Sequence, residues 1–390
     1  MKLPWLKPAL EDAGPFISVH LDTTRTDPSA STELTTRWNQ CRSRLSAAGV
    51  DDELLEEIGD TVLAPSSIGG RHGRAIIASP REILLDRVLP VPPREDVSAF
   101  GATPVLLPLV QLTPYAVSQL LIEVDRAGAD LHLRAPENPV IARSRNDLDG
   151  ESRVDGGHDE LHKASAGGGA QHGWRARNFD ARVEDSWERN AEAVAKKVDA
   201  IVVKHKPDMV LLTGDVRATA LLKDALGAEA RARLQVVSGG TRGVSMERAS
   251  FREELERVTQ EFIGKRQREL AGTFHENQRR GTDSLAGVAE VGEALGRGQV
   301  DELLFVVGQE PETIEELIRQ AVATDAGVFA LEDGVASIPE GVGALLRWRD
   351  EATPSNELSS MSDDPRREDA VDPDHDERTP HQREEDAIRR

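Results

Sequence analysis

Cysteine is nearly absent from the chain, which has one residue of this type, Cys41, among 390. A single thiol cannot form an intrachain disulfide or a cysteine-based zinc cluster, so a secreted disulfide scaffold is excluded. The first residues lack the long apolar core of a signal peptide, and no run approaches the roughly 20 apolar residues that a membrane span needs. We therefore expect a soluble cytoplasmic protein without membrane contact.

Basic residues are also in short supply, and the formal net charge is -21, with 48 Lys and Arg against 69 Asp and Glu. Acidity of this size argues against a surface that is wrapped in nucleic acid, and DNA is not an expected partner. It leaves room for one local basic surface. A chain of this length is long enough for two or three domains, each with its own core.

The first part of the chain, residues 1–110, has the pattern of a mixed α/β domain. Apolar side chains at helical spacing predict a helix over 33–48. Runs of apolar residues predict strands at 15–21, 74–78, 83–91 and 105–110.

Two further α/β units and a tail follow. Residues 111–272 open with a predicted strand pair at 117–134. Strands and helices then alternate, with helices expected at 180–201, 216–226 and 249–272 and strands at 208–214 and 233–240. Residues 273–350 alternate in the same way, with helices expected at 283–297 and 312–324 and strands at 300–308, 327–334 and 342–348. Residues 351–390 are highly charged and contain no Phe, Trp or Tyr, so we expect a disordered tail.

One long segment, 135–178, shows no periodicity and is rich in Gly, Asp, Asn, Arg and His. A long loop inside a compact domain is unusual and is often functional. Within and just after it, residues 161–179 contain no Asp or Glu, in a chain with 69 acidic residues. This composition suits contact with RNA, because glycine lets the backbone approach closely and cationic or aromatic side chains can bind phosphate or stack on a base.

Three segments together resemble the archaeal and eukaryotic class 1 release factor and Pelota superfamily. The strand pair 117–134 resembles the start of that family's RNase H-like middle domain. The sequence LHKASAGGGAQHGWRARNFDARVEDSWERNAEAVAKKVD resembles its glycine-rich loop, the basic residues after it and the long helix that follows. The sequences SLAGVAEVGEALGRGQVDELLFV and GVGALLRW resemble its L7Ae-like third domain. Within the superfamily the chain is most similar to the bacterial branch, common in actinobacteria, that includes the ribosome hibernation factor Balon.

The resemblance implies a fold and a function. The expected architecture is an α/β N-terminal domain (1–110), an RNase H-like middle domain (111–272), an L7Ae-like C-terminal domain (273–350) and the tail. The implied function is that of a hibernation or stress factor in the ribosomal A site, with elongation factor Tu as a possible partner and with no cofactor or metal. The loop would reach the peptidyl-transferase centre and bind rRNA through Lys163, Gly167, Gly168, Gly169, Gln171, His172, Trp174, Arg175 and Arg177.

Two departures from the release factor pattern limit the activity that we expect. Ala170 separates Gln171 from the glycines, whereas in release factors the glutamine follows two glycines directly. One inserted residue moves the amide by roughly 3.3–3.6 Å along an extended chain, and catalysis is sensitive to misplacement of about 1 Å. The first domain also lacks the Asn-Ile-Lys-Ser codon-reading motif, so we do not expect stop-codon decoding.

Two other functions remain open. The chain could be a peptidyl-tRNA hydrolase or tRNA nuclease in ribosome rescue, as in the related Vms-type proteins, with Gln171 as its catalytic residue. It could also be a small α/β binding protein that has left the ribosome, which its acidic composition favours.

Several local features have simpler interpretations. His158 and His162 lack the glutamate position of a His-Glu-x-x-His zinc site, and the triple glycine lacks the Lys-Ser/Thr of a phosphate-binding loop. Asp215 follows a predicted strand and is expected to cap the next helix. Trp187 lies in the apolar stripe of the long helix and is expected in the core.

Overall fold

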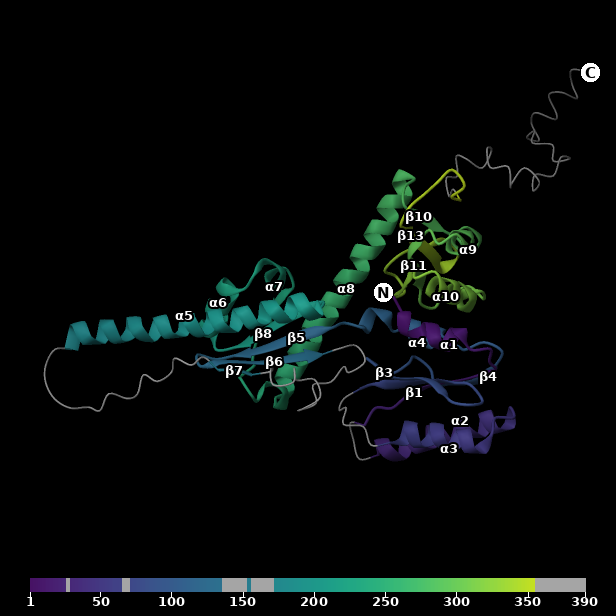
Figure 1. The fold of residues 1–390 in the computed structure, drawn as a ribbon, viewed down its shortest axis with the longest axis horizontal. Coiled ribbons are helices and arrows are strands. Elements are labelled where there is room, and N and C mark those ends of the chain that lie inside the picture. The colour runs from purple at the N-terminus through teal and green to yellow at the C-terminus, as the bar shows by residue number, and fades with distance from the viewer. Residues whose placement is uncertain (26–28, 65–70, 135–152, 156–171, 355–390) are drawn as a thin grey trace, which may run out of the picture.

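The computed structural model describes residues 1–25, 29–64, 71–134, 153–155 and 172–354, and for 155 and 172–186 only the backbone. These residues form three β-sheets that follow one another along the chain, each packed against helices (Figure 1). The predicted α/β class with three domains is confirmed. Among the described residues, no helix is both long and apolar enough to cross a membrane.

The N-terminal sheet is antiparallel, with the strand order β3-β2-β1-β4. Its strands are β1 (Phe16–Asp22), β2 (Gly73–Ala78), β3 (Ile83–Leu89) and β4 (Val97–Gly101). Two helices, α2 (Ala30–Ala47) and α3 (Asp52–Leu63), cover one face through a core that includes Trp38, Leu45 and Ile58. The remaining short helices of this region are η1 (Pro4–Leu6), α1 (Lys7–Glu11) and η2 (Thr113–Tyr115).

The strand predicted at 105–110 is wrong, because this segment contains the short helix α4 (Leu107–Val110). Pro108 stands in its first turn, where the missing N–H of proline costs nothing. The carboxylate of Glu315 accepts hydrogen bonds from the N–H groups of Leu106 and Leu107 at 3.0–3.1 Å. A contact with a residue that is distant in the sequence therefore stabilises a helix over an apolar run.

The middle sheet has the strand order β7-β6-β5-β8-β9. Its strands are β5 (Gln119–Val124), β6 (Gly128–Arg134), β7 (Arg153–Asp155), β8 (Met209–Gly214) and β9 (Leu234–Val236). The pair predicted at 117–134 is confirmed as an antiparallel hairpin, with Gln119 opposite Arg134. Strands β8 and β9 run parallel to β5.

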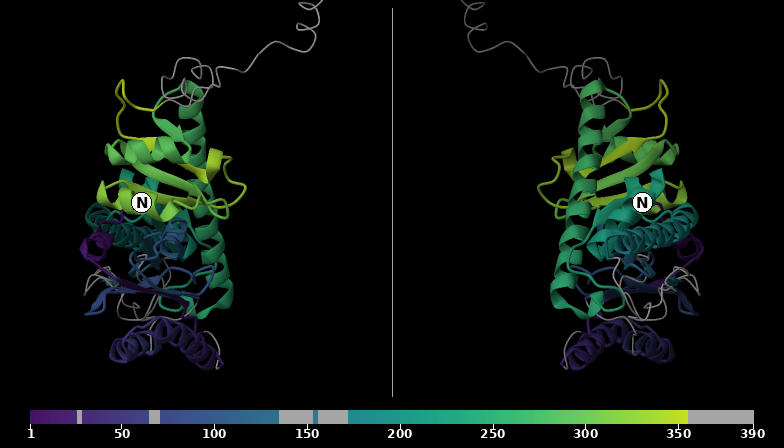
Figure 2. Two further views of the ribbon diagram at one scale, coloured as in Figure 1. Left: turned by 90° about the vertical axis from the view of Figure 1, so that its right-hand side faces the viewer. Right: turned by 90° about the vertical axis from the view of Figure 1, so that its left-hand side faces the viewer.

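Helices cover both faces of the middle sheet. One face packs against α5 (His172–His205), α6 (Val216–Ala225) and α7 (Ala228–Ala232). The other packs against the first half of α8 (Ala249–Arg280), which follows the short helix η3 (Ser245–Glu247). Helix α8 then continues to the C-terminal sheet (Figure 2), so the domain boundary predicted at 272/273 falls inside one unbroken helix.

The C-terminal sheet has the order β10-β13-β11-β12. It consists of β10 (Ser284–Ala286), β11 (Val300–Val306), β12 (Gly327–Leu331) and β13 (Val342–Leu346), with helices α9 (Val288–Gly296), α10 (Ile314–Ala323) and η4 (Pro339–Gly341). The helix predicted at 283–297 is correct only from Val288. Gly287, with a φ of +94°, turns the chain between β10 and α9, a conformation that glycine adopts without strain.

The N-terminal and C-terminal domains share one hydrophobic core. Buried side chains from both form a single cluster, which includes Leu6, Leu89, Leu106, Leu303, Phe305 and Val328. Polar contacts cross the same boundary, such as the 2.8 Å ion pair between Lys7 and Asp325 and the pair between Arg94 and Glu332. Burial and the hydrogen bond that its hydroxyl donates to Glu332 raise the pKa of Tyr115 to about 12. The N-terminal and C-terminal domains thus form one unit beside the middle domain.

The start of the predicted tail is folded. The amide of Gln299 donates a hydrogen bond of 2.8 Å to the hydroxyl of Thr353, which is itself buried. Residues 355–390 lie outside the described residues, so their disorder stays a prediction.

Deleting 355–390 should change the melting temperature by no more than about 1–2 °C, because surface changes away from a core are usually within ±0.5 kcal/mol. Thermal unfolding of the full chain and of a chain that ends at Pro354 tests this. Gln299→Ala serves as the contrast, since it leaves the Thr353 contact unmade. A drop of many degrees on deletion would show that the tail packs on the body.

Candidate RNA interface

The predicted rRNA-binding residues fall in two groups. Lys163, Gly167, Gly168, Gly169 and Gln171 lie outside the described residues, as do His158 and His162. His172, Trp174, Arg175 and Arg177 belong to the first turns of α5, of which only the backbone is described. The helix therefore begins at His172 rather than at 180, where the apolar stripe starts. Residues without apolar periodicity can still be helical, since only Gly173 among 172–179 is a poor helix former.

Helix α5 gives the second group, His172, Trp174, Arg175 and Arg177, its position in the fold. It has 34 residues, which corresponds to roughly 50 Å of helix. Its C-terminal half lies on the middle sheet through buried side chains such as Val194, Val198 and Ile201. Its N-terminal half projects past the edge of the sheet (Figure 1). The segment that the sequence predicts to contact RNA thus leads into a projecting helix whose C-terminal half is packed on the middle sheet.

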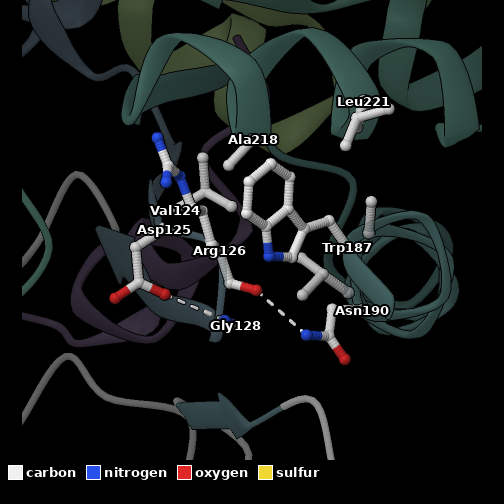
Figure 3. A pocket seen from close by; sticks show the side chains of 10 residues that line it. Val124, Asp125, Arg126, Gly128, Trp187, Asn190, Ala218 and Leu221 are labelled. Carbon is white, nitrogen blue, oxygen red and sulfur yellow. Dashed lines mark hydrogen bonds between the residues drawn. The ribbon is translucent and has the colours of Figure 1, made fainter. Parts of the chain in front are cut away.

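Trp187 lies where α5 leaves the sheet, so its prediction as a core residue is only partly correct. The side chain is half-buried. The guanidinium carbon of Arg126 lies 4.6 Å from the centre of the Trp187 ring system, and that of Arg217 lies 5.6 Å from it. Figure 3 shows the indole between the turn that carries Arg126 and helix α6. The ring therefore sits at the rim of the core, in contact with two cations.

Asp215 caps the next helix, as predicted. Its carboxylate accepts hydrogen bonds from the N–H groups of Arg217 and Ala218, both at 3.0 Å. Its second oxygen lies 3.4 Å from the Arg126 guanidinium. This carboxylate is engaged in helix capping and in an ion pair, which leaves it poorly placed as a general base.

A network of charged residues that the sequence did not predict lies beside the turn between β5 and β6. The buried guanidinium of Arg242 donates hydrogen bonds of 3.0 Å to Asp125 and Asp130. The N–H of Gly243 donates one of 3.1 Å to Glu123. These contacts tie the loop after β9 to the hairpin of β5 and β6. The three acids precede Arg242 by more than 100 positions, so no local pattern marks them.

The pKa of the Glu123 carboxyl shows that this network favours the charged form. Burial by itself would raise the pKa, but hydrogen bonds from His132, Ser245 and the Gly243 N–H outweigh burial and hold it below its usual value. A carboxylate that stays ionised anchors the loop and is a poor proton donor. Within the described part of the chain, no three His, Cys, Asp or Glu side chains are grouped so that they could hold a metal ion.

Residues 118–280 match the family model of bacterial archaeo-eukaryotic release factor family 2. The chain is 27% identical over 358 residues to two uncharacterised proteins of Mycobacterium tuberculosis, MT2704 of strain CDC 1551 and Rv2629 of strain H37Rv, covering 90% of this chain and 88% of each relative.

Solved structures of low similarity include the archaeal translation termination factor aRF1, with 15% identity, 86% of this chain and 93% of that chain covered and a TM-score of 0.22. Dom34 of S. cerevisiae has 10% identity, coverages of 72% and 80% and a TM-score of 0.39. An archaeal Pelota in a model of ribosome-bound Pelota and ABCE1 has 14% identity, coverages of 89% and 93% and a TM-score of 0.37.

Proposed function

We propose that this chain, whose residues 118–280 match the family model of bacterial archaeo-eukaryotic release factor family 2, is a cytoplasmic hibernation or stress factor that occupies the ribosomal A site. The observation that carries the proposal is the match of the middle domain, 118–280, to a release factor family. Residues 172–179, the last part of the acid-free segment, form the first turns of α5 in that same domain.

The chemistry of this segment supports contact with rRNA. A protein that enters an RNA active site needs few acids, close backbone approach and donors for phosphate and 2'-OH groups. Residues 161–179 contain three consecutive glycines, one Lys, two Arg and no acid. The packing of α5 on the middle sheet supports such a contact, because rigid elements hold a site more accurately than loops do. In this proposal the loop reaches toward the peptidyl-transferase centre and acts by occupancy.

Stop-codon decoding is not part of the proposal, since the chain contains no Asn-Ile-Lys-Ser motif. The resemblance to Balon-like proteins suggests elongation factor Tu as the partner that delivers the protein. No cofactor is required.

Sedimentation with vacant 70S ribosomes at physiological salt tests the proposal. We expect the purified protein to pellet with the ribosomes, and to do so equally well when a sense codon or a stop codon stands in the A site. Measurements with and without elongation factor Tu show whether delivery is needed. Protein that stays in the supernatant under both conditions would refute ribosome binding, and a clear preference for stop codons would refute the lack of decoding.

A further inference from the structure

We propose that Arg126 and Arg217, stacked against Trp187 at the edge of the middle sheet, form a second RNA contact that binds the phosphodiester backbone. We call these three residues the arginine clamp. The inference rests on the proposed function, since it takes the RNA to be that of the ribosome. The clamp consists of described residues only and is separate from the glycine-rich loop.

The clamp is built from three elements that meet at one point (Figure 3). Trp187 comes from α5, Arg126 from the turn between β5 and β6, and Arg217 from the first turn of α6. The amide of Asn190, one turn along α5, donates a hydrogen bond of 2.9 Å to the carbonyl of Arg126 and so fixes the turn. Asp215 fixes the start of α6. The backbone on which each arginine stands is thus held in place.

Both cations remain open to solvent. The Arg126 side chain is 55% exposed, and Arg217 is exposed as well. Beside them stands Val216, which is 87% exposed and is the most exposed large apolar residue of the described chain. The edge therefore combines exposed cationic and apolar side chains with the partly exposed carboxylates of Asp215 and Asp125, in a protein whose net charge is -21. Apolar surface with cations beside it is the composition of a contact surface.

Phosphate is the ligand that this arrangement fits. A guanidinium that stacks on an aromatic ring loses side-chain freedom before it binds, while the N–H groups at its edge still point outward. Arginine can donate two of them to one phosphate. A small enclosed ligand is a poor alternative, because the cavity beside Trp187 has a volume of only about 10 Å³. The occupant is then a surface ligand that carries negative charge.

The position of the clamp favours RNA over an acidic protein. Trp187 follows Trp174 by 13 positions on the same helix, a separation of roughly 20 Å along its axis. RNA that meets the projecting end of α5 can therefore run back along the helix to the clamp. Two contacts on one rigid helix would fix both the position and the direction of the middle domain.

The clamp is tested by ribosome sedimentation at several salt concentrations. Arg126→Ala with Arg217→Ala should weaken binding about 10-fold and reduce the slope of log K against log salt by about two, since each arginine neutralises one phosphate. The matched control is Arg257→Ala with Arg280→Ala, which removes the same charge from exposed, ion-paired positions on α8. Equal effects of the two double variants would overturn the clamp.

Asp215→Asn gives a result that a folding defect cannot imitate. Asparagine caps a helix about as well as aspartate, while the negative charge beside Arg126 is removed. Binding should therefore become tighter, by about threefold, with a steeper salt dependence. Unchanged or weaker binding by a variant with the wild-type melting temperature would contradict the proposal.

A photo-reactive amino acid at position 216 identifies the occupant. We expect it to crosslink to rRNA in the complex with the ribosome. Crosslinks to protein alone would show that the edge is a protein-docking surface and would overturn the clamp. If the wild type binds ribosomes while these tests fail, the clamp is wrong and the proposed function stands. If the wild type does not bind, both are wrong.

Discussion

Replacing Lys163, Arg175 and Arg177 together with alanine is expected to weaken binding to 70S ribosomes by roughly 10- to 100-fold at physiological salt. These are the cations of the acid-free segment 161–179. Each phosphate that a cation neutralises releases counterions, so the loss of three contacts should lower the slope of log K against log salt by about three. A sedimentation titration at four or more salt concentrations measures both quantities.

The control for this triple variant is Arg257→Ala, Lys265→Ala and Arg280→Ala, which removes the same charge from exposed positions on α8. It should change binding by less than about threefold, because these residues take part in surface ion pairs along the helix. If both triple variants weaken binding equally, only the net charge matters and the loop has no special role.

Gln171→Ala separates occupancy from catalysis at the same loop. If the loop acts by contact, this change should weaken binding by about fivefold, the effect of one lost hydrogen bond of about 1 kcal/mol. Peptide release from ribosomes that carry peptidyl-tRNA in the P site should stay at background for the wild type. Suppose instead that the wild type releases peptide or cleaves tRNA, and that Gln171→Ala abolishes this while binding survives. The inserted Ala170 would then be accommodated, and the protein would be a rescue enzyme.

The sequence predicts those elements that local patterns determine. The hairpin at 117–134 is such a case, because apolar runs on both sides of the turn at 125–127 determine where its strands pair. The cap at Asp215 is another, since it needs only the two N–H groups that follow it. Most of the strands and helices in the second half of the chain were predictable for the same reason, although the short elements α7 (Ala228–Ala232) and β10 (Ser284–Ala286) were not.

Elements that depend on distant residues were not predictable in this way. The run 105–110 resembles a strand by composition, and its helix is stabilised by Glu315, which lies more than 200 positions away. Trp187 stands in the apolar stripe of α5, yet its ring lies at the rim of the core, against Arg126 of the β5–β6 turn and Arg217 of α6. A helical pattern shows which face is apolar, but not where along the helix the partner surface ends.

The same distinction between local patterns and distant contacts applies to the candidate site. The acid-free segment is visible in the sequence, since it combines three consecutive glycines with one Lys, two Arg and no acid. The arginine clamp is not visible, because its residues come from three elements and only one of them is close to the segment. The shared core of the N-terminal and C-terminal domains is hidden as well, since it joins residues near both ends of the described chain.

Leu106→Ala is expected to destabilise the N-terminal and C-terminal domains together, by about 2–5 kcal/mol. Leu106 is fully buried in the shared core, and its N–H is bound by Glu315 of α10. Removing its side chain leaves a cavity where the two domains meet, so neither domain can repair the loss alone. Hydrogen exchange should speed up both in β2, at 73–78, and in β12, at 327–331, although these strands belong to different sheets.

Leu222→Ala is the matched control, because Leu222 is also fully buried but belongs to the core between the middle sheet and α6. It should speed up exchange in β8, at 209–214, and leave β2 and β12 protected. If Leu106→Ala affects β2 alone, the N-terminal domain unfolds independently and the shared core is only a docking contact. If both strands respond, the N-terminal domain cannot move apart from the C-terminal domain without exposing apolar surface. Any reorientation of domains on the ribosome would then be a movement of the middle domain relative to the other two. The linker before β5 and helix α8 would have to accommodate that movement.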